Sequence, residues 1–369
     1  MTPDTLILLA TVSGYGDVSS DGYPSWSERA MHLYTNMMRV DPEAFEQDYI
    51  SGGCDLSVFS EEERTPKDPL YFNTALNEIA RDHSEDMRDS GNFSHSSSDG
   101  TSFADRVWAV YDNNVAIGEN IAYGYSGPWS TVVHGWMCSD AGHRESIMSD
   151  EYTELGCGTA ESYATQDFGG AAISPPGPIA MGIHEPEAPS GEVAFAVDWL
   201  DEEAPVRLRV LIEGRPLDLS LMYGTERRGV YGIDEVLMAD YGDGCLSYHF
   251  RYVTASGLEG SFPEDGSYLL GECDSETMWS SDQQGVSGML GGVLPGLQDA
   301  EDASSWEPSK SGRGCSVTSG AAGLALLPGL LAIASRRHRR EGSSDCTGYK
   351  ARRDSKEGER NAAAFDGAQ

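Results

Sequence analysis

Residues 73–91 read NTALNEIARDHSEDMRDSG, and this stretch predicts the central helix of the first folded region. Asn73 belongs to the residue types that cap helix N-termini, and Gly91 can adopt the left-handed conformation that ends a helix. Between them, apolar residues and one histidine recur at helical spacing. These positions are Leu76, Ile79, Ala80, His83 and Met87. The stretch therefore predicts an amphipathic helix that buries one face.

Similar local signals predict helices on both sides of this stretch. Residues 25–28, SWSE, form a capping-box pattern, and the helix that follows is expected to end near Arg39. Asp41-Pro42 then starts a turn or second helix, because aspartate caps and proline fits the first helical position. A further short helix is expected over about 130–138.

The chain changes character near residue 170. Residues 155–159 and 163–168 are typical of short strands, and the Gly- and Pro-rich segment 169–178 then interrupts the pattern. Three later runs alternate or are continuously apolar between turn residues. They are 192–199, 206–212 and 248–253. We therefore expect an α+β first domain over residues 23–170 and a small all-β sandwich over residues 180–275.

The C-terminal region predicts attachment to a membrane. Residues 316–335, SVTSGAAGLALLPGLLAIAS, carry no charge and are followed by RRHRR at 336–340. This length and basic flank are typical of a transmembrane helix whose following residues stay in the cytoplasm. We expect one span with its basic stop over 315–340, an acidic flexible stalk over 276–314, and a disordered tail over 341–369.

An alternative for residues 316–335 is a buried core helix rich in glycine and alanine. Export of the preceding region would need a signal, and residues 1–22 contain only a weak one. Residues 6–12, LILLATV, are apolar but short, and only the α-amino group is positive before them. The expectation of export therefore depends on the C-terminal pattern.

The charge distribution argues against nucleic acid as a partner. The chain has 25 basic and 60 acidic residues. Nine basic and six acidic ones follow Ser335, so residues 1–335 have a net charge of −38. Phosphate backbones would be repelled by such a surface. The acidity is interpreted as a solvated surface that favours solubility.

The cysteines favour two local disulfides in an oxidising compartment. No CxxC pair occurs among the seven, which argues against a zinc ribbon or a thioredoxin-like site. Cys138 and Cys157 are 19 residues apart in the first domain, and Cys245 and Cys273 are 28 apart in the second. Cys54 remains and could compete for a partner in the first pair.

Three short polar segments hold the residues best suited to chemistry. They are Asn92–His95, Gly118–Ile121 and Gly142–Arg144, which we expect to be loops. Two histidines and a carboxylate are the minimum for a metal or acid–base site. A structural alternative is that Glu119 fastens the loops by hydrogen bonds to both imidazoles. The sequence has no GxSxG, HExxH or phosphate-binding glycine loop.

Six short motifs follow one another between residues 26 and 169, and the segment 163–169, YATQDFG, closes them. The motifs are ARDHSEDM at 80–87, FSHS at 93–96 with Asp99-Gly100, GENIA at 118–122, VHGWM at 133–137, GHR at 142–144 with Ile147-Met148, and YTELGCG at 152–158. Their order resembles the CAP superfamily of cysteine-rich secretory, antigen 5 and plant pathogenesis-related proteins. Within it, the chain looks like the bacterial SCP-like branch.

This resemblance implies an α-β-α sandwich with a central cleft. His95, Glu119 and His143 match the family's cleft residues, and the position of a second acidic residue falls on Ser139, with Asp140 as its neighbour. In some relatives the two histidines hold a divalent metal such as zinc. The resemblance therefore implies a zinc ion on His95 and His143, with Glu119 supporting them.

The C-terminal pattern has a resemblance of its own. Gly314-Cys315, the apolar span and the arginine cluster resemble the sorting tail of myxobacterial-type surface proteins. This likeness implies that Cys315 is a processing or lipidation point. The alternative is an unmodified cysteine at the membrane edge.

Together these features predict a surface-anchored protein of the cell envelope, held by one membrane span or released after processing. We expect a module that binds a small ligand, a lipid or an envelope component. One alternative is a metal-dependent hydrolase of peptide or ester bonds, in which Glu119 is the catalytic residue that helps to deprotonate a water. Another is a carrier of lipid or sterol.

Overall fold

The computed structural model describes most of the chain up to residue 283. The described residues are 14–49, 59–112, 114–139, 141–189, 191–242 and 244–283. Residues 1–13 of the expected export signal, most of the stalk, the expected span at 315–340 with Cys315, and the tail at 341–369 lie outside them. Within the described ranges, no helix is long and apolar enough to cross a membrane.

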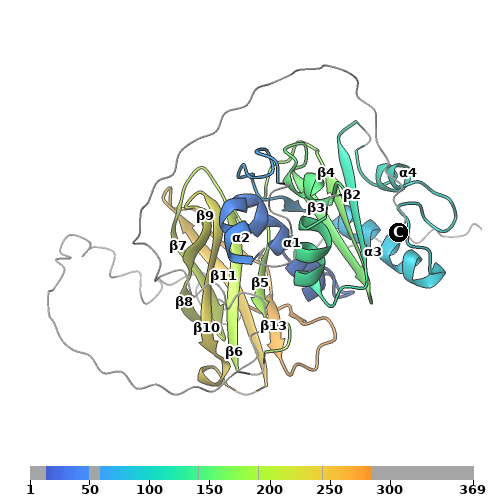
Figure 1. The fold of residues 1–369 in the computed structure, drawn as a ribbon. Helices are drawn as coiled ribbons and strands as arrows, with labels where there is room; N and C mark the ends of the chain where they lie inside the picture. The colour runs from blue at the N-terminus through green and yellow to red at the C-terminus, as the bar shows by residue number, and fades with distance from the viewer. Residues whose placement is uncertain are drawn as a thin grey trace, which may run out of the picture. The chain divides into compact units, whose positions relative to one another are not determined.

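The described residues divide into two compact units (Figure 1). One contains residues 34–173, and the other contains residues 14–33 and 174–283. The α+β content of the chain is confirmed. Among the described residues, every helix of more than one turn ends before residue 149. The described strands form three sheets.

The unit of residues 34–173 is built on a four-stranded sheet. Its strands, in spatial order, are β1 (Tyr71–Phe72), β3 (Glu154–Ala160), β4 (Tyr163–Gly169) and β2 (Ile117–Tyr123). The pair β1–β3 is parallel, and the other pairs are antiparallel. Strand β2 therefore lies at an edge of the sheet, where only one side of its backbone is paired.

Six helices lie before residue 149 in the described chain. Four of them begin near the residues that the sequence predicts, whereas those at 103–108 and 143–148 were not predicted. Their bounds are α1 (Trp26–Val40), α2 (Pro42–Tyr49), α3 (Thr74–Ser90), α4 (Phe103–Trp108), the π-helix η2 (Ser130–Met137) and α5 (His143–Met148). Asn73 Oδ1 accepts a hydrogen bond from Leu76 N at 3.0 Å, and Gly91 ends α3 with a φ of 68°. The helix predicted at 73–91 is confirmed.

Helices cover both faces of this sheet. On one face, α3 packs so closely that a Cβ on Gly156 or Gly158 would come within 2.1 or 2.0 Å of its backbone. On the other face, Gln166 Nε2 of β4 donates to Thr35 Oγ1 of α1 at 2.7 Å. The two glycines are thus required by the approach of α3 to the sheet.

The second unit contains two sheets. One has the order β5 (Gly182–Glu185), β6 (Glu192–Leu200), β10 (Arg228–Leu237), β9 (Ser220–Thr225). The other has the order β14 (Trp279–Ser280), β13 (Ser267–Gly271), β11 (Cys245–Thr254), β7 (Pro205–Ile212), β8 (Arg215–Asp218). Strand β12 (Glu259–Phe262) also pairs with β11. A short 3-10 helix, η3 (Met238–Asp240), follows β10. The three predicted strands at 192–199, 206–212 and 248–253 are confirmed.

Aromatic side chains join the two sheets of this unit. The rings of Phe195 in β6 and Tyr248 in β11 lie 5.0 Å apart between centroids, and those of Trp199 and Tyr252 lie 5.5 Å apart. Both contacts run from one sheet to the other, so the two sheets pack face to face. This is the layered arrangement expected of a β-sandwich.

The first residues of the described chain belong to the β-rich unit. Trp26 Nε1 donates to His184 O at 2.8 Å, and the guanidinium of Arg29 lies 3.8 Å from the centroid of the Tyr268 ring. Tyr268 also donates to Gly16 O at 2.7 Å. These contacts explain why residues 14–33, including the first part of α1, group with the β-rich unit.

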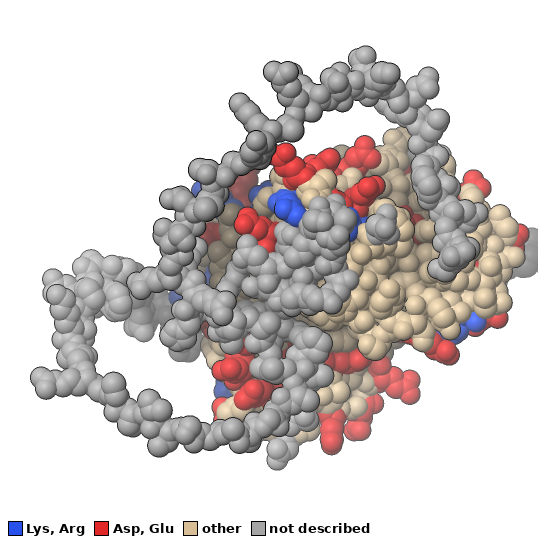
Figure 2. All heavy atoms as spheres, in the orientation of Figure 1, with Lys and Arg blue, Asp and Glu red and all other residues tan. Residues whose placement is uncertain are grey.

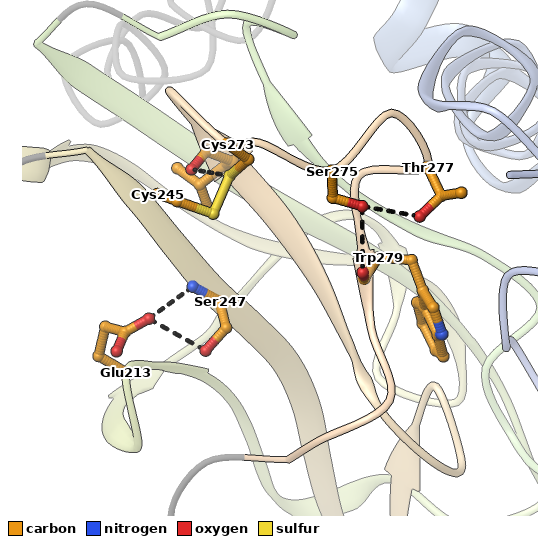
Figure 3. The surroundings of a disulfide bond; sticks show 8 residues. Glu213, Cys245, Ser247, Cys273, Ser275, Thr277 and Trp279 are labelled. Atoms are coloured by element: carbon orange, nitrogen blue, oxygen red, sulfur yellow. Dashed lines mark hydrogen bonds between the residues drawn. A yellow bond between two sulfur atoms is a disulfide. The ribbon is translucent and has the colours of Figure 1, made fainter.

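One of the two predicted disulfides is confirmed. Cys245, at the start of β11, is bonded to Cys273, just after β13, with a Cα–Cα distance of 4.5 Å (Figure 3). In the same region, Glu213 Oε1 accepts hydrogen bonds from the backbone N–H of Ser247 at 2.6 Å and from its hydroxyl at 3.0 Å. The bond and the glutamate both tie strand β11 to its neighbours.

The predicted pairing of Cys138 with Cys157 is wrong. Cys157 keeps a buried thiol, and its sulfur lies 4.0 Å from Gln166 Nε2 inside the sheet. Cys138 is disulfide-bonded, and its partner is neither Cys157 nor a member of the pair described above. A short sequence separation did not identify the disulfide partner of Cys138, because the side chain of Cys157 is buried against the sheet beside Gln166. Cys54 lies outside the described residues.

Candidate functional site

The candidate site is organised by the edge strand β2. Residues 118–121 were expected to form a loop, and this expectation is wrong, since they lie within a strand that pairs with β4 from Ile117 to Tyr123. The segment holds glycine, glutamate and asparagine, which are depleted in strands, so its local signal for a strand is poor. Pairing with β4 imposes the extended conformation, and alternate side chains then point to opposite faces.

Glu119 holds the first histidine from one face of the sheet. Its Oε1 accepts a hydrogen bond from His95 Nδ1 at 2.7 Å, and its Oε2 accepts one from Arg106. The Glu119 side chain is 1% exposed, whereas that of His95 is 45% exposed. Because a carboxylate only accepts, the hydrogen of the His95 ring is on Nδ1, and Nε2 keeps a lone pair for a ligand.

Arg106, on α4, was not among the predicted residues. Besides Glu119, its guanidinium donates to His95 O at 3.3 Å and to Ser97 Oγ at 3.0 Å. It therefore fixes both the carboxylate and the backbone of the loop that carries His95. Nothing in the local sequence distinguishes this arginine from one at the surface, because its role depends on where α4 lies.

The side chain of Asn120, the next residue, points to the opposite face of the sheet from Glu119. There it binds the segment that carries His143. Its Nδ2 donates to His143 O at 3.1 Å and to Gln166 Oε1 at 3.2 Å. Gly118 has no side chain because a Cβ there would lie 2.4 Å from the hydroxyl of Tyr152. Each residue of the GEN motif thus has a separate structural reason.

The expectation that Gly142–Arg144 forms a loop is wrong for its last two residues, because His143 and Arg144 begin helix α5. The His143 ring contacts Ser139. The Ser139 hydroxyl lies 2.9 Å from His143 Nδ1. Burial, and after it the neighbouring His95, lower the pKa of His143 to about 4. This ring is therefore neutral at physiological pH. The structure shows two pairs, His95 with Glu119 and His143 with Ser139, and Asn120, next to Glu119 in β2, connects the segment of His143 to that strand.

The neighbours of His143 explain the GHR motif. Gly142 has a φ of 87°, in the left-handed region that favours glycine. Arg144 is buried: its Nε donates to Glu63 Oε1 at 2.7 Å, and its Nη1 donates to Met137 O and Ser139 O, both at 2.9 Å. Arginine here anchors the turn that presents His143. Asp140, the alternative acidic residue, lies outside the described residues.

Both imidazoles have Nδ1 within hydrogen-bonding distance of a neighbouring side chain, Glu119 for His95 and Ser139 for His143. Such contacts are common at metal-bound histidines, where they orient the ring. No group of three or more His, Cys, Asp or Glu side chains able to hold a metal occurs in the described part of the chain. A metal at this place would therefore need water or an external ligand to complete its coordination.

Two more buried groups adjoin Glu119. His83, on the buried face of α3, lies with Nε2 2.9 Å from Ser94 O and 3.9 Å from Glu119 Oε2, and burial lowers its pKa. Asp167 is completely buried and lies opposite Glu119 in the pairing of β2 with β4. Sequence reasoning did not single out Asp167, because only the strand register places it beside the site.

Comparisons with known proteins bear on residues 34–171, which match the profile of CAP: Cysteine-rich secretory protein family. Two proteins of Bacillus subtilis (strain 168) are similar to part of the chain. The uncharacterized membrane protein YlbC is 42% identical over 100 residues, which cover 27% of this chain and 28% of YlbC. The uncharacterized protein YkwD is 37% identical over 102 residues, which cover 27% of this chain and 39% of YkwD.

The chain thus spans well under half the length of either relative. A crystal structure of an extracellular protein containing a SCP domain from Bacillus anthracis str. Ames is 25% identical, with a TM-score of 0.29. That match covers 39% of this chain and 40% of the other.

Proposed function

We propose that residues 34–171, which match the CAP profile, form a CAP domain, and that the protein is a surface-anchored module that binds a ligand at the site of His95, Glu119, Ser139 and His143. The observation that carries this proposal is the arrangement of the two imidazoles. Each has Nδ1 in contact with a neighbouring side chain, Glu119 or Ser139, and this supports the proposal that both use Nε2 for one ligand.

We further propose that the ligand includes a divalent metal such as zinc, held by His95 and His143. A bound metal would supply a Lewis acid at which a group of the partner molecule could bind. The low pKa of His143 supports this, because a neutral imidazole is the form that binds metals. Glu119 and Ser139 would act on the metal only by orienting the rings.

Several features support a place outside the cytoplasm. Cys245 and Cys273 form a disulfide, and Cys138 is disulfide-bonded too, which is typical of oxidising compartments. On the face shown in Figure 2, acidic side chains are spread over the described surface and basic ones are sparse. The similar protein YlbC is named as a membrane protein.

The proposal includes the anchor predicted from sequence. Residues 315–340 would span the membrane in the manner of a myxobacterial-type sorting tail, with processing or lipidation at Cys315. The partner would be a small ligand, a lipid or another component of the envelope. Mass spectrometry of the mature C-terminus tests this part, because an unprocessed chain ending at Gln369 would contradict the processing step.

Zinc titration of metal-free, purified full-length protein tests the site. We expect a single zinc ion to bind the wild type and binding to be lost in the His95→Ala/His143→Ala double variant. The matched control is His134→Ala, since His134 is exposed on η2 and should not affect zinc. Zinc bound by the double variant as well as by the wild type would contradict the proposal.

Loss of a supporting residue should act more weakly than loss of a ligand. We expect Glu119→Gln to weaken zinc binding by about 10- to 100-fold, the usual effect of removing a group that orients a ligating histidine. Unchanged affinity would contradict the orienting role of Glu119.

The hydrolase alternative would make Glu119 a catalytic base. The Glu119 side chain is 1% exposed and its two oxygens face His95 and Arg106, so a water on the metal would have little access to it. This argues for binding over catalysis. Incubation with peptide and ester libraries, with and without chelator, tests the choice: chelator-sensitive turnover lost in Glu119→Gln would favour the hydrolase.

A further inference from the structure

Two carboxyl groups face each other inside the sheet beside the candidate site. Glu119 in β2 and Asp167 in β4 are directly opposite in the antiparallel register, so their side chains leave the same face of the sheet. The Glu119 side chain is 1% exposed, and Asp167 is completely buried. Two acidic residues thus share one water-excluded place.

The two carboxyls have different partners. Glu119 accepts hydrogen bonds at both oxygens, from His95 and from Arg106. Neither oxygen of Asp167 has a hydrogen-bond partner among the described residues. Two ionised carboxylates cannot bond to each other, since both only accept, whereas one proton between them makes a strong bond.

Among the described residues, the arginine that acts on both acids is Arg106. Arg106 on α4 forms an ion pair with Glu119. His83 on α3 is kept neutral because burial lowers its pKa, and its partly exposed neighbour His95 already donates to Glu119. An ionised Asp167 would therefore leave a second negative charge buried and uncompensated, which is very costly.

Electrostatics agrees with this count of charges. Burial, and after it the negative charge of Glu119, raise the pKa of Asp167 well above its usual value, while Arg106 opposes the shift only in part. The two side chains also lie within hydrogen-bonding reach once one of them carries a proton.

We propose that Asp167 keeps its proton in the folded protein and donates it to Glu119, so that the buried pair carries a single negative charge. Asp167 is then a positioning residue of the site. Its hydrogen bond holds the Glu119 carboxylate in the orientation that accepts from His95. Because the protonated Asp167 carries no charge, Arg106 forms its ion pair with Glu119 only. An ionised Asp167 would instead compete for Arg106 and repel Glu119.

Infrared spectroscopy of the metal-free, full-length protein tests this directly. We expect the wild type at neutral pH to show the C=O stretch of a protonated carboxylic acid, and we expect Asp167→Asn to lose it. Absence of that band in the wild type, or its persistence unchanged in the variant, would overturn the proposal. If asparagine does not fit the site, Asp167→Ser removes the same carboxyl while keeping a donor, and the same comparison applies.

The pH dependence of folding gives a second readout. Because the folded-state pKa of Asp167 is raised, the folded protein holds a proton that the unfolded chain has released. Wild-type stability should therefore fall as pH rises from the unfolded pKa to the folded one. In this window, the folding equilibrium constant of Asp167→Asn relative to wild type should rise about tenfold per pH unit. Parallel profiles would overturn the proposal.

Asp198 provides the matched control. It is also completely buried, but its Oδ1 accepts hydrogen bonds from the backbone N–H groups of Ala180 at 2.7 Å and Met181 at 2.8 Å, which favour the ionised form. Asp198→Asn should leave the acid band unchanged and should destabilise the protein. The tests use no metal, so failure of the zinc proposal would leave this inference standing.

Discussion

Removing the charge of Glu119 should destabilise the protein strongly, because it leaves the Arg106 guanidinium without its anion. The two side chains are 1% and 9% exposed, so water cannot replace the lost partner. Breaking a buried ion pair at one end costs about 3–5 kcal/mol. We expect Glu119→Gln and Arg106→Met each to lower the free energy of unfolding by an amount in this range.

A double-mutant cycle separates the pair from its surroundings. In the double variant neither charge remains, so we expect it to lose about 1–3 kcal/mol less than the sum of the two single variants. Urea unfolding, followed by the fluorescence of the buried Trp136 in the same unit, measures all four proteins. Additive losses would refute the reasoning, because they would mean that the two residues do not stabilise each other.

An exposed ion pair serves as the control for this cycle. Arg209 Nε lies 2.5 Å from Asp218 Oδ1 across β7 and β8, but their side chains are 31% and 73% exposed. Such pairs contribute about 0–1 kcal/mol, because water screens them. The corresponding cycle at Arg209 and Asp218 should therefore show little coupling.

Two further predictions concern the packing and the disulfide. Gly158→Ala should lower the free energy of unfolding by about 3 kcal/mol, because its Cβ would lie 2.0 Å from the backbone of α3. As a control, Gly191→Ala places its Cβ where no atom lies within 4 Å. It should change the free energy of unfolding by less than about 0.5 kcal/mol in the same urea assay. Replacing Cys245 and Cys273 by serine opens a loop of 28 residues and should cost the β-rich unit about 3–4 kcal/mol, measured by thermal unfolding. Equal losses for the two alanine variants, or an unchanged melting temperature for the serine variant, would contradict these accounts.

Helix ends were the most predictable part of the fold. Ser25 and Glu28 form the capping box that their spacing indicates, with Ser25 N donating to Glu28 Oε2 at 2.9 Å. Asp41 Oδ1 accepts from Ala44 N at 3.1 Å at the start of α2. These bonds join residues three apart in the chain, so their geometry follows from local sequence alone.

The candidate site was predictable only in part. The motifs around His95, Glu119 and His143 pointed to side chains that act together, and the structure shows the contact of His95 with Glu119. That His143 shares a ligand with His95 stays a prediction. It could not be predicted that Ser139 would contact His143 Nδ1, or that residues 118–121 would be a strand. Both depend on segments that are distant in the chain.

The sequence by itself determined the helices, the β-rich strands and the motifs that carry the two histidines, because hydrophobic periodicity, capping and turn residues act over a few positions. Only the tertiary structure decided that Cys138 and Cys157 do not pair and that Arg106 and Asp167 adjoin Glu119. The physical reason is that strand register and helix docking set which side chains share a buried space. The balance of charge in that space then sets their protonation.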